Sequence, residues 1–513
     1  MNKNTVPDAS GVFAKFATQT RFEDFPAKVI ANTKRSIFDT VGVMLAGGGP
    51  DAQAHRIAQM LAAWGGAPTG TVIGHDMKLP APNAAFANAA MAHQYDFDDV
   101  HDEAVAHPTN SSFSGTLAAA QEMPGATGRK LLASVLVGNE VVCRVGLAIK
   151  GALYDYVWIW PAVVAIWGAT TASARVMGLT ADQLQSAYGL TLHQTGTTLQ
   201  CHHGPGSDVR GFRDGFGARN GVTAAYMARA GLRGDPEAFE GKYGFYGAFF
   251  RGEYDRERLL AGLGQHYAAE RISIKAWASA RETHATLQAL LELRERHGID
   301  PAAIERVVMR VGETNMRFCE PGAARRRPTV RMDALCALPF CASVALIHGG
   351  VPLGAFSENG MRDERVLALA ERIAWQADEA LSHGTVEGGD VEISLRNGQT
   401  FRHQVRHGMG HPDFPVSDEL LVRKFIDCAA LATCSVSESQ VREFWEMVQK
   451  LEDISVAEFS AALRAFFARK LTKKKRRRTW SVGEYCSRPR RRPRAWDGNP
   501  RFPHPGPPGP FGW

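Results

Sequence analysis

The sequence predicts a mainly α-helical protein with an inserted α+β region. Apolar residues recur at helical spacing through residues 1–270, short strand-like segments separated by turn residues occupy 271–408, and helical spacing returns over 409–469. Hydrophobic residues make up 45% of the 513 residues and charged residues 22%, a balance typical of a globular protein with a large core. A chain of this length is expected to form more than one domain.

Several helices are expected in the first region. An apolar-periodic run over residues 29–45 follows Pro26, and three consecutive glycines at 47–49 end it, because glycine favours a helix C-terminus. Alanine and leucine are frequent, and β-branched runs are short, in the other helices predicted there, over residues 85–93, 114–122, 128–149 and 222–230.

Residues 156–174 form an uncharged stretch of nineteen residues, which approaches the length of a membrane-spanning helix. Pro161, however, stands where a helix can begin, and Gly168 and the Thr and Ala residues after it are only weakly apolar. We therefore expect a buried central helix here and no membrane span.

Strand and helix patterns alternate within the α+β region. The pattern predicts strands over 271–275 and 304–311 and a helix over 281–297. Asn397 and Gly398 separate two alternating segments, 390–395 and 399–405. This dipeptide between two strand patterns predicts a hairpin with a tight primed turn.

Residues 470–513 differ in composition from the rest of the chain. They hold thirteen Lys or Arg against two acids, a net +11, so the formal charge of +6 leaves −5 for residues 1–469. Six consecutive cations at 473–478 repel one another, and eight prolines after residue 488 prevent regular structure. We expect a disordered tail, and no nucleic-acid binding by the folded body, because the excess positive charge is confined to the tail.

The eight cysteines include no CxxC pair and no zinc-like Cys/His pattern, which favours free thiols in a reducing compartment. The N-terminal sequence MNKNTVPDASGVF has no apolar core of signal-peptide length. These two features predict a soluble, cytoplasmic protein.

The densest group of chemically active side chains runs from His93 to Pro108. Five carboxylates and three imidazoles fall within fifteen residues, and such crowding shifts pKa values and suits proton transfer. The ordinary alternative is a polar helix end with aspartate caps. A rival interpretation rests on Asp98, Asp99 and Asp102, which match the DDxxD pattern that holds Mg²⁺ and diphosphate in helical terpene synthases; the DxDD motif of terpene cyclases also begins at Asp96. No second metal motif follows, so we expect no metal.

Histidines later in the chain offer another metal option. His202 and His203 are adjacent, so on regular structure they point in different directions, and Asp208 is the one acid near them and His193. We expect these to be loop histidines without a metal.

A glycine-rich stretch, residues 206–221, contains arginines that suit carboxylate binding. Glycine lets the backbone approach a ligand, and the guanidinium fork matches a carboxylate. The stretch holds Arg210, Arg213 and Arg219. Lys275 and Arg281 add cations at the start of the α+β region. Each alone is more often a surface charge, but together with His107 they predict a pocket for an anionic substrate.

Taken in order, several motifs resemble the MmgE/PrpD family. Residues 92–99 followed by His107-Pro108 resemble its HxxDFDD…HP signature, and residues 240–245 are similar to its EGxxGF turn. Lys275 with His284 resembles the start of its lid domain. Its late GHPxxP…KF block is matched by Gly410-His411-Pro412, Pro415 and Lys424-Phe425. The resemblance covers residues 13–463, and its specificity lies in the number and order of the motifs.

The resemblance implies a large helical domain built from both ends of the chain, an inserted α+β lid, and a homodimer. It implies an active site between the two domains that needs no cofactor, with Asp96, His107 and Lys275 as catalytic residues. The substrate-binding positions expected beside them are Arg210, Arg213, His284, Trp160 and Phe340.

Four positions depart from the family pattern. Val100 stands where the family often has Thr, Trp160 where it often has His, Arg210 where a Lys is expected, and Phe340 where a Tyr is expected. Arg210 keeps the positive charge of the expected Lys. Trp160 and Phe340, however, lack the proton-handling groups of the expected His and Tyr.

The activity that the resemblance implies is removal of a proton next to a carboxylate of a small di- or tricarboxylate. His107 or Lys275 would take the proton, Arg210, Arg213 and Lys275 would stabilise the enediolate, and Asp96 would orient His107. We expect a lyase of the 2-methylcitrate dehydratase type. The alternatives are an epimerase of the iminodisuccinate epimerase type, which needs no acid for a leaving hydroxyl, a decarboxylase of the cis-aconitate type, and a degenerate member that only binds.

Overall fold

The computed structural model describes residues 7–152, 155–202, 207–382, 386 and 388–465. All of them belong to one compact unit that ends at Arg469. The tail predicted over residues 470–513 lies outside the described residues, as do His203 and the side chain of His202.

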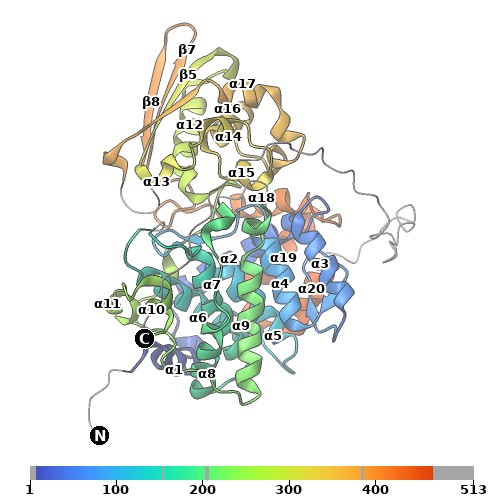
Figure 1. Ribbon diagram of the computed structural model, residues 1–513. Coiled ribbons are helices and arrows are strands. Elements are labelled where there is room, and N and C mark those ends of the chain that lie inside the picture. The colour runs from blue at the N-terminus through green and yellow to red at the C-terminus, as the bar shows by residue number, and fades with distance from the viewer. Residues whose placement is uncertain (1–6, 153–154, 203–206, 383–385, 387, 466–513) are drawn as a thin grey trace, which may run out of the picture. The chain divides into compact units, whose positions relative to one another are not determined.

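Helices dominate the structure (Figure 1). The N-terminal part of the helical body comprises α1 (Ala9–Gln19), α2 (Ala27–Gly47), α3 (Gln53–Trp64), α4 (Ala81–Ala92), α5 (Pro108–Ala120), α6 (Gly128–Leu147), α7 (Trp160–Met177), α8 (Ala181–Leu192), α9 (Asp214–Arg229), α10 (Phe245–Phe250) and α11 (Arg256–Leu260). Its C-terminal part comprises α18 (Asp418–Ala429), α19 (Glu438–Gln449) and α20 (Val456–Ala465). Four short strands accompany them: β1 (Gly70–Thr71), β2 (Lys78–Leu79), β3 (Val100–His101) and β4 (Ile272–Ser273).

Helix α5 lies at the centre of the body, and all of its residues are buried. Small residues let its neighbours approach closely. A Cβ atom on Gly115 of α5 would lie 2.8 Å from the Ser173 hydroxyl of α7, and a Cβ on Gly138 of α6 would lie 2.8 Å from the Ser112 hydroxyl of α5. Because α5 begins at Pro108, this tight packing fixes the position of His107 immediately before it.

The uncharged stretch over 156–174 contributes most of α7, which is buried among α5, α6 and α9. The prediction of a buried helix is therefore confirmed. Among the described helices, none combines the length and the apolar character that crossing a membrane requires.

The two ends of the chain build the body together. The ring of Phe38 in α2 lies 4.6 Å from that of Phe425 in α18 and 4.9 Å from that of Trp445 in α19, measured between centroids. Helices α18 and α19 pack against α2. This arrangement confirms a large helical domain formed by both ends of the chain.

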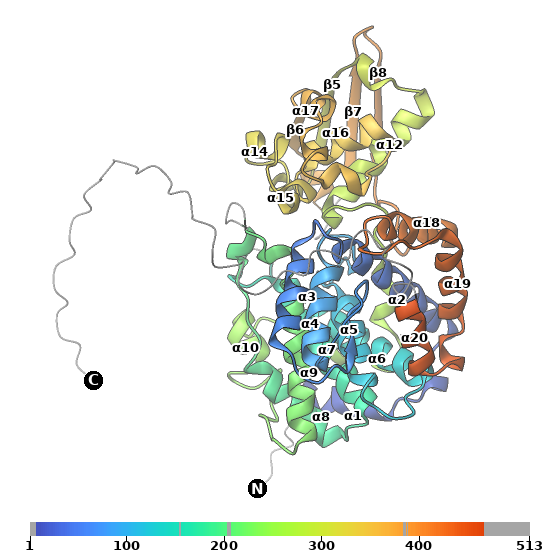
Figure 2. The same ribbon diagram turned by 90° about the vertical axis from the view of Figure 1, so that its right-hand side faces the viewer.

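The inserted region carries a four-stranded sheet in the order β6-β5-β7-β8 (Figure 2). Its strands are β5 (Ile304–Val311), β6 (Ile373–Ala377), β7 (Gly389–Leu395) and β8 (Thr400–Val405), and only the β5–β6 pair is parallel. Its helices are α12 (His284–His297), α13 (Glu313–Met316), α14 (Gly322–Arg326), α15 (Arg331–Leu335), α16 (Leu338–His348) and α17 (Glu364–Ala370). Helix α12 packs against β7, β8 and α16, so the region is a two-layer α+β unit, as predicted.

The hairpin is confirmed, but its turn differs from the prediction. Ser394 pairs with Thr400, and the Gly398 N–H donates to the Leu395 carbonyl, so residues 396–398 form a three-residue loop. The type I′ turn that favours Asn-Gly needs positive φ at both central positions, and within this loop only Gly398 has it, at +86°. Register across the strands, rather than the Asn-Gly pair, decides the turn type.

Two other local predictions are corrected. The strand expected over 271–275 shortens to β4, which pairs with β3 and not with the four-stranded sheet. The helix expected over 114–122 begins earlier, at Pro108. Strand β6 was not predicted, because its burial fades along its length and gives no clean alternation. The boundaries proposed for the domains, at residues 270 and 408, stay a prediction.

Candidate active site

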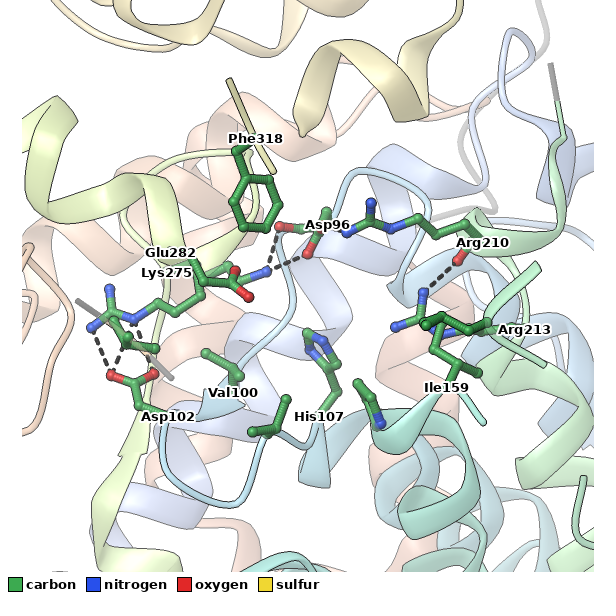
Figure 3. Close-up of a pocket in the computed structure, with 15 residues that line it drawn as sticks. Asp96, Val100, Asp102, His107, Ile159, Arg210, Arg213, Lys275, Glu282 and Phe318 are labelled. Carbon is green, nitrogen blue, oxygen red and sulfur yellow. Dashed lines mark hydrogen bonds and ion pairs between the residues drawn. The ribbon is translucent and has the colours of Figure 1, made fainter. Parts of the chain in front are cut away.

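Four stretches of the chain supply most of the residues that line a pocket (Figure 3). They are the loop between α4 and α5, the start of α7, the segment before α9, and the beginning of the inserted region. Five of the eight site residues predicted from the sequence line it: Asp96, His107, Arg210, Arg213 and Lys275.

The short β3–β4 pairing brings Lys275 to Asp96. Val100 pairs with Ser273, which sets the loop that carries Asp96 beside the segment that carries Lys275. The Lys275 ammonium donates to the Asp96 carbonyl at 2.7 Å and also to the Asp96 carboxylate, and its side chain is fully buried. Asp96 adopts a left-handed backbone conformation, with φ of +47°, which aspartate tolerates better than most residues.

Asp96 is surrounded by hydrogen-bond donors. Arg210 reaches its second carboxylate oxygen at 3.3 Å, and the Cys336 thiol lies 3.9 Å from the same oxygen. Burial alone would raise the pKa of Asp96, but Lys275 and the other cations around it hold that pKa well below its usual value. The carboxylate is therefore ionised and serves as the counter-ion of Lys275.

His107 is oriented by the loop that precedes it. Its Nδ1 donates to the Asp99 carbonyl at 2.9 Å and lies 3.4 Å from the Asp98 carboxylate. Because Nδ1 carries the proton, the neutral ring has its lone pair on Nε2. Burial lowers the pKa of His107 to about 3, so the imidazole is neutral near pH 7 and its Nε2 lone pair is unprotonated.

This geometry corrects the role expected of Asp96. The sequence predicts that Asp96 orients His107, but the structure places the Asp99 carbonyl and Asp98 beside the His107 Nδ1 and pairs Asp96 with Lys275. The reason is the left-handed turn at Asp96, which directs consecutive side chains of the loop to different partners.

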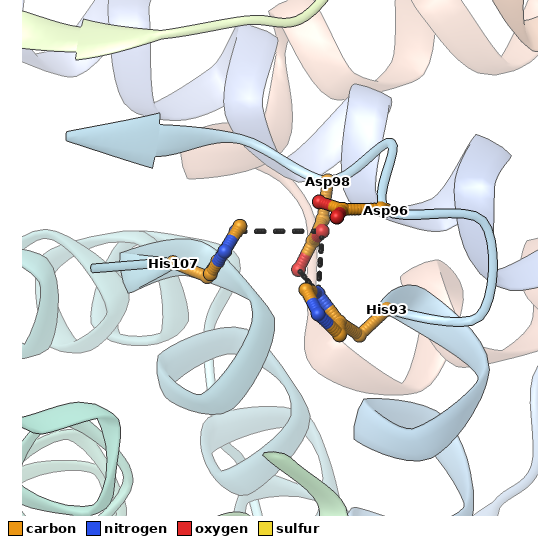
Figure 4. Close-up of side chains that lie close together, drawn as sticks. All are labelled: His93, Asp96, Asp98 and His107. Atoms are coloured by element: carbon orange, nitrogen blue, oxygen red, sulfur yellow. Dashed lines mark hydrogen bonds and ion pairs between the residues drawn. The ribbon is translucent and has the colours of Figure 1, made fainter. Parts of the chain in front are cut away.

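A buried hydrogen-bond network lies on the Nδ1 side of the His107 ring (Figure 4). Asp98 accepts from His93 Nδ1 at 2.9 Å and from the Asn110 amide at 3.0 Å. The His93 and His107 rings meet edge to face, with centroids 4.6 Å apart. Burial, reinforced by Arg213, lowers the pKa of His93 to about 3, so this ring is also neutral.

The same cluster has the composition of a metal site, since ligand atoms of His93, Asp96, Asp98 and His107 lie within 4.8 Å of one another. Its electrostatics oppose a divalent cation. Lys275 and Arg210 already bind Asp96, and Nδ1 of His107 is committed as a donor. We therefore interpret the cluster as a proton-handling network.

The aspartates of the DDxxD pattern do not converge on a common point. Asp98 binds His93, Asp99 accepts from the Thr109 backbone N–H, and Asp102 receives the Arg281 guanidinium on both oxygens. The terpene-synthase interpretation is therefore not supported. His193 is not among the residues that line the pocket: its side chain is exposed and pairs with Asp235 at 2.8 Å.

Two guanidinium groups form one wall of the pocket. Figure 3 shows Arg210 and Arg213 on the opposite side of Asp96 from Lys275. Arg213 donates to the Arg210 carbonyl at 2.9 Å, and its Nε, 3.7 Å from Asp214, has no hydrogen-bond partner among the described residues. A buried guanidinium with donor capacity to spare is suited to binding a carboxylate.

Three predicted site residues do not line the pocket. Trp160 packs in the apolar core against Phe250, and its neighbours Ile159 and Pro161 line the pocket instead. Phe340, in α16, is also a core residue.

His284 lies beneath Arg281, with its Nδ1 3.3 Å from that guanidinium. Burial, reinforced by Arg281, holds the pKa of His284 well below its usual value. A neutral histidine in this place contacts Arg281, whose guanidinium pairs with Asp102, and does not itself line the pocket.

The structure adds residues that sequence reasoning missed. The aromatic ring of the pocket is Phe318, and Glu282 contributes a carboxylate that pairs with Arg317 at 3.2 Å. Glu282 stands next to the cationic Arg281, which was a usable signal. Phe318 and Ile159 carry no local signal, because their places depend on how the inserted region and α7 fold back.

Fold and pocket together define a class: mainly helical proteins with an inserted α+β unit and a buried site of carboxylate, imidazole and cationic groups. The family model of the MmgE/PrpD N-terminal domain matches residues 11–257, and that of the MmgE/PrpD C-terminal domain matches residues 277–453. The chain belongs to the MmgE/PrpD family.

Known relatives are enzymes. The chain is 25% identical over 470 residues to a cis-aconitate decarboxylase of Aspergillus terreus, a match that covers 87% of this chain and 94% of the relative. It is 26% identical over 440 residues to the cis-aconitate decarboxylase of Homo sapiens, covering 83% and 88%. It is 24% identical over 361 residues to the 2-methylcitrate dehydratase of Salmonella typhimurium, covering 66% and 73%. These values support enzyme status for a divergent family member.

Proposed function

We propose that the pocket is the active site of a lyase that moves a proton at the carbon next to a carboxylate of a small di- or tricarboxylate. One observation carries the proposal. A neutral imidazole, His107, and a buried ammonium, Lys275, line the same pocket as the two guanidiniums of Arg210 and Arg213.

In the proposed mechanism each group has one task. Arg213 and Arg210 hold a substrate carboxylate, and Nε2 of His107 removes the proton from the adjacent carbon. Lys275 stabilises the negative charge that develops on the enediolate, and Asp96 keeps that ammonium in place. In a dehydration the enediolate then expels the hydroxyl from the next carbon, and the proton that His107 has taken leaves with this hydroxyl as water. These steps use side chains of this chain, so the proposal needs no cofactor.

The first reaction to test is dehydration of the 2-methylcitrate dehydratase type. Decarboxylation is a second candidate, because the similarity to the cis-aconitate decarboxylases extends over more of the chain than the similarity to the dehydratases. Epimerisation is a third, because Val100 and Ile159 offer no acid to a leaving hydroxyl where they line the pocket.

The deciding experiment incubates the protein in D₂O with cis-aconitate, 2-methylcitrate and a panel of other di- and tricarboxylates. Loss of water identifies a dehydratase, release of CO₂ a decarboxylase, and deuterium in recovered substrate without either product an epimerase. Binding of citrate by calorimetry, without exchange or product for any compound, would refute the enzymatic proposal and leave a protein that only binds.

Assembly and location complete the proposal. We propose a homodimer, which light scattering of the purified chain tests directly, and a cytoplasmic location. Seven cysteines lie among the described residues, and all seven are free, as suits a reducing compartment.

A further inference from the structure

Lys424, in α18, is a buried lysine whose ammonium makes two hydrogen bonds and one ion pair. Its ammonium donates to the Phe97 carbonyl at 2.8 Å and to the Lys275 carbonyl at 3.0 Å, and it lies 2.7 Å from the Asp39 carboxylate. Of the three protons that an ammonium can donate, two go to backbone carbonyls.

Two of these acceptors belong to the segments that carry the proposed catalytic pair. Phe97 follows Asp96 directly, and the other carbonyl is that of Lys275 itself. The ammonium also lies 3.8 Å from the centroid of the Phe97 ring. Lys424 thus joins the loop between α4 and α5 to the start of the inserted region, from a helix that follows both in the chain.

Asp96 needs such an external restraint. Its left-handed backbone conformation, with φ of +47°, is less favourable for a residue with a side chain and persists where the surroundings impose it. The bond from Lys424 holds the next carbonyl, and the bond from Lys275 holds the carbonyl of Asp96 itself at 2.7 Å. Two successive carbonyls are therefore fixed by two ammonium groups.

Stability alone does not explain a buried ion pair here. Removing Lys424 and Asp39 from water costs desolvation energy that well-packed apolar side chains would not incur. What apolar residues could not supply is the pair of directed bonds to backbone carbonyls.

We infer that Lys424 is a positioning residue: through the carbonyls of Phe97 and Lys275 it holds the Asp96 carboxylate and the Lys275 ammonium in contact. Its effect on turnover rests on the proposed function, whereas the restraint on the two segments does not.

The chain offers a matched control. Lys34, in α2, is also buried and also ties α2 to the C-terminal part of the body, through the Gln449 carbonyl at 2.6 Å and Glu452 at 2.7 Å. It touches neither catalytic segment. Lys34→Met therefore removes a comparable buried ammonium without loosening the pocket.

The experiment compares Lys424→Met, the double variant Asp39→Asn/Lys424→Met, and Lys34→Met by amide hydrogen exchange of the full chain. The reporters are the Asp96 N–H, bonded to the His93 carbonyl at 3.0 Å, and the Ile274 N–H, bonded to the Gly410 carbonyl at 3.1 Å. Both should exchange about tenfold faster or more in the two Lys424 variants, which corresponds to roughly 1.4 kcal/mol of local opening. The double variant leaves no buried carboxylate without its counter-ion. Faster exchange in it therefore reports loosening of the two segments and not poor folding caused by an unpaired charge.

Unchanged exchange at these amides in the Lys424 variants, or an equal rise in Lys34→Met, would overturn the inference. With any compound that the wild type turns over, kcat should fall about tenfold or more at nearly constant KM in the Lys424 variants only. Faster exchange with unchanged kcat would reduce Lys424 to an architectural residue. If the wild type turns over none of the compounds, the proposed function fails while the exchange data still decide the restraint.

Discussion

Replacing Arg213 by Met tests the carboxylate wall of the pocket. Arg213 is buried, and its Nε has no hydrogen-bond partner among the described residues. A hydrogen bond to a charged group contributes about 1.5–3 kcal/mol. Loss of one such bond to a bound carboxylate should therefore weaken binding roughly 10- to 150-fold. Methionine keeps most of the side-chain length, so packing changes little.

Calorimetry or thermal shift with cis-aconitate and citrate measures the effect. Where the wild type turns a compound over, KM should rise with little change in kcat, since Arg213 contacts a carboxylate that is present before and during the reaction. Because Asp214 lies 3.7 Å from Arg213 and is buried, the double variant Arg213→Met/Asp214→Asn controls for an unpaired charge.

Arg219, in helix α9 that begins directly after Arg213, supplies the matched control. It stacks over the rings of Phe86 and Phe216, at 5.2 and 5.8 Å, and is not among the residues that line the pocket. Arg219→Met should bind carboxylates as the wild type does. Equal affinity in Arg213→Met and the wild type, or an equal loss in both arginine variants, would refute the assignment of the carboxylate wall.

Three further predictions concern catalysis, acid stability and the tail. His107→Ala and Lys275→Ala should each lower turnover about a hundredfold or more. Deuterium exchange into the substrate measures this loss, and replacement of an exposed histidine by Ala serves as the control. Either variant with over a tenth of wild-type activity would contradict the mechanism. Burial lowers the pKa of both His93 and His107 to about 3 in the folded protein. The stability that these two neutral histidines contribute is complete above their pKa in the unfolded chain, about 6.5, and is lost as pH falls toward 3, because the unfolded chain takes up protons first. The double variant His93→Gln/His107→Gln should therefore lose less thermal stability than the wild type between pH 7 and pH 4. Burial raises the pKa of Asp99 to about 7, which acts in the opposite sense, so Asp99→Asn should steepen that loss. Truncation after Lys470 should leave the melting temperature and activity unchanged. It should move the isoelectric point below neutrality, because the excess positive charge lies after Lys470. Unfolding on truncation would show that the tail is structural.

The sequence determined the features that depend on neighbouring residues. Helical spacing placed α2 and α6 within a few residues of their ends, and alternation placed β5 at its observed bounds. Three stretches that the sequence singles out meet at the pocket: the one dense in acids and imidazoles around Asp96 and His107, the arginines near 210, and the start of the inserted region at Lys275. Local chemistry sufficed there because periodicity and residue type record which face of an element is buried and which segments carry reactive groups.

Only the tertiary structure decided which of these groups touch. It paired Asp96 with Lys275 instead of His107, set Phe318 in the pocket where Phe340 was expected, and placed Lys424 against both catalytic segments. These contacts join residues separated by well over a hundred positions, and they depend on the β3–β4 pairing and on the return of the C-terminal helices to α2. A side chain's partner is fixed by the angle at which distant elements pack, and that angle results from the whole core rather than from any local pattern.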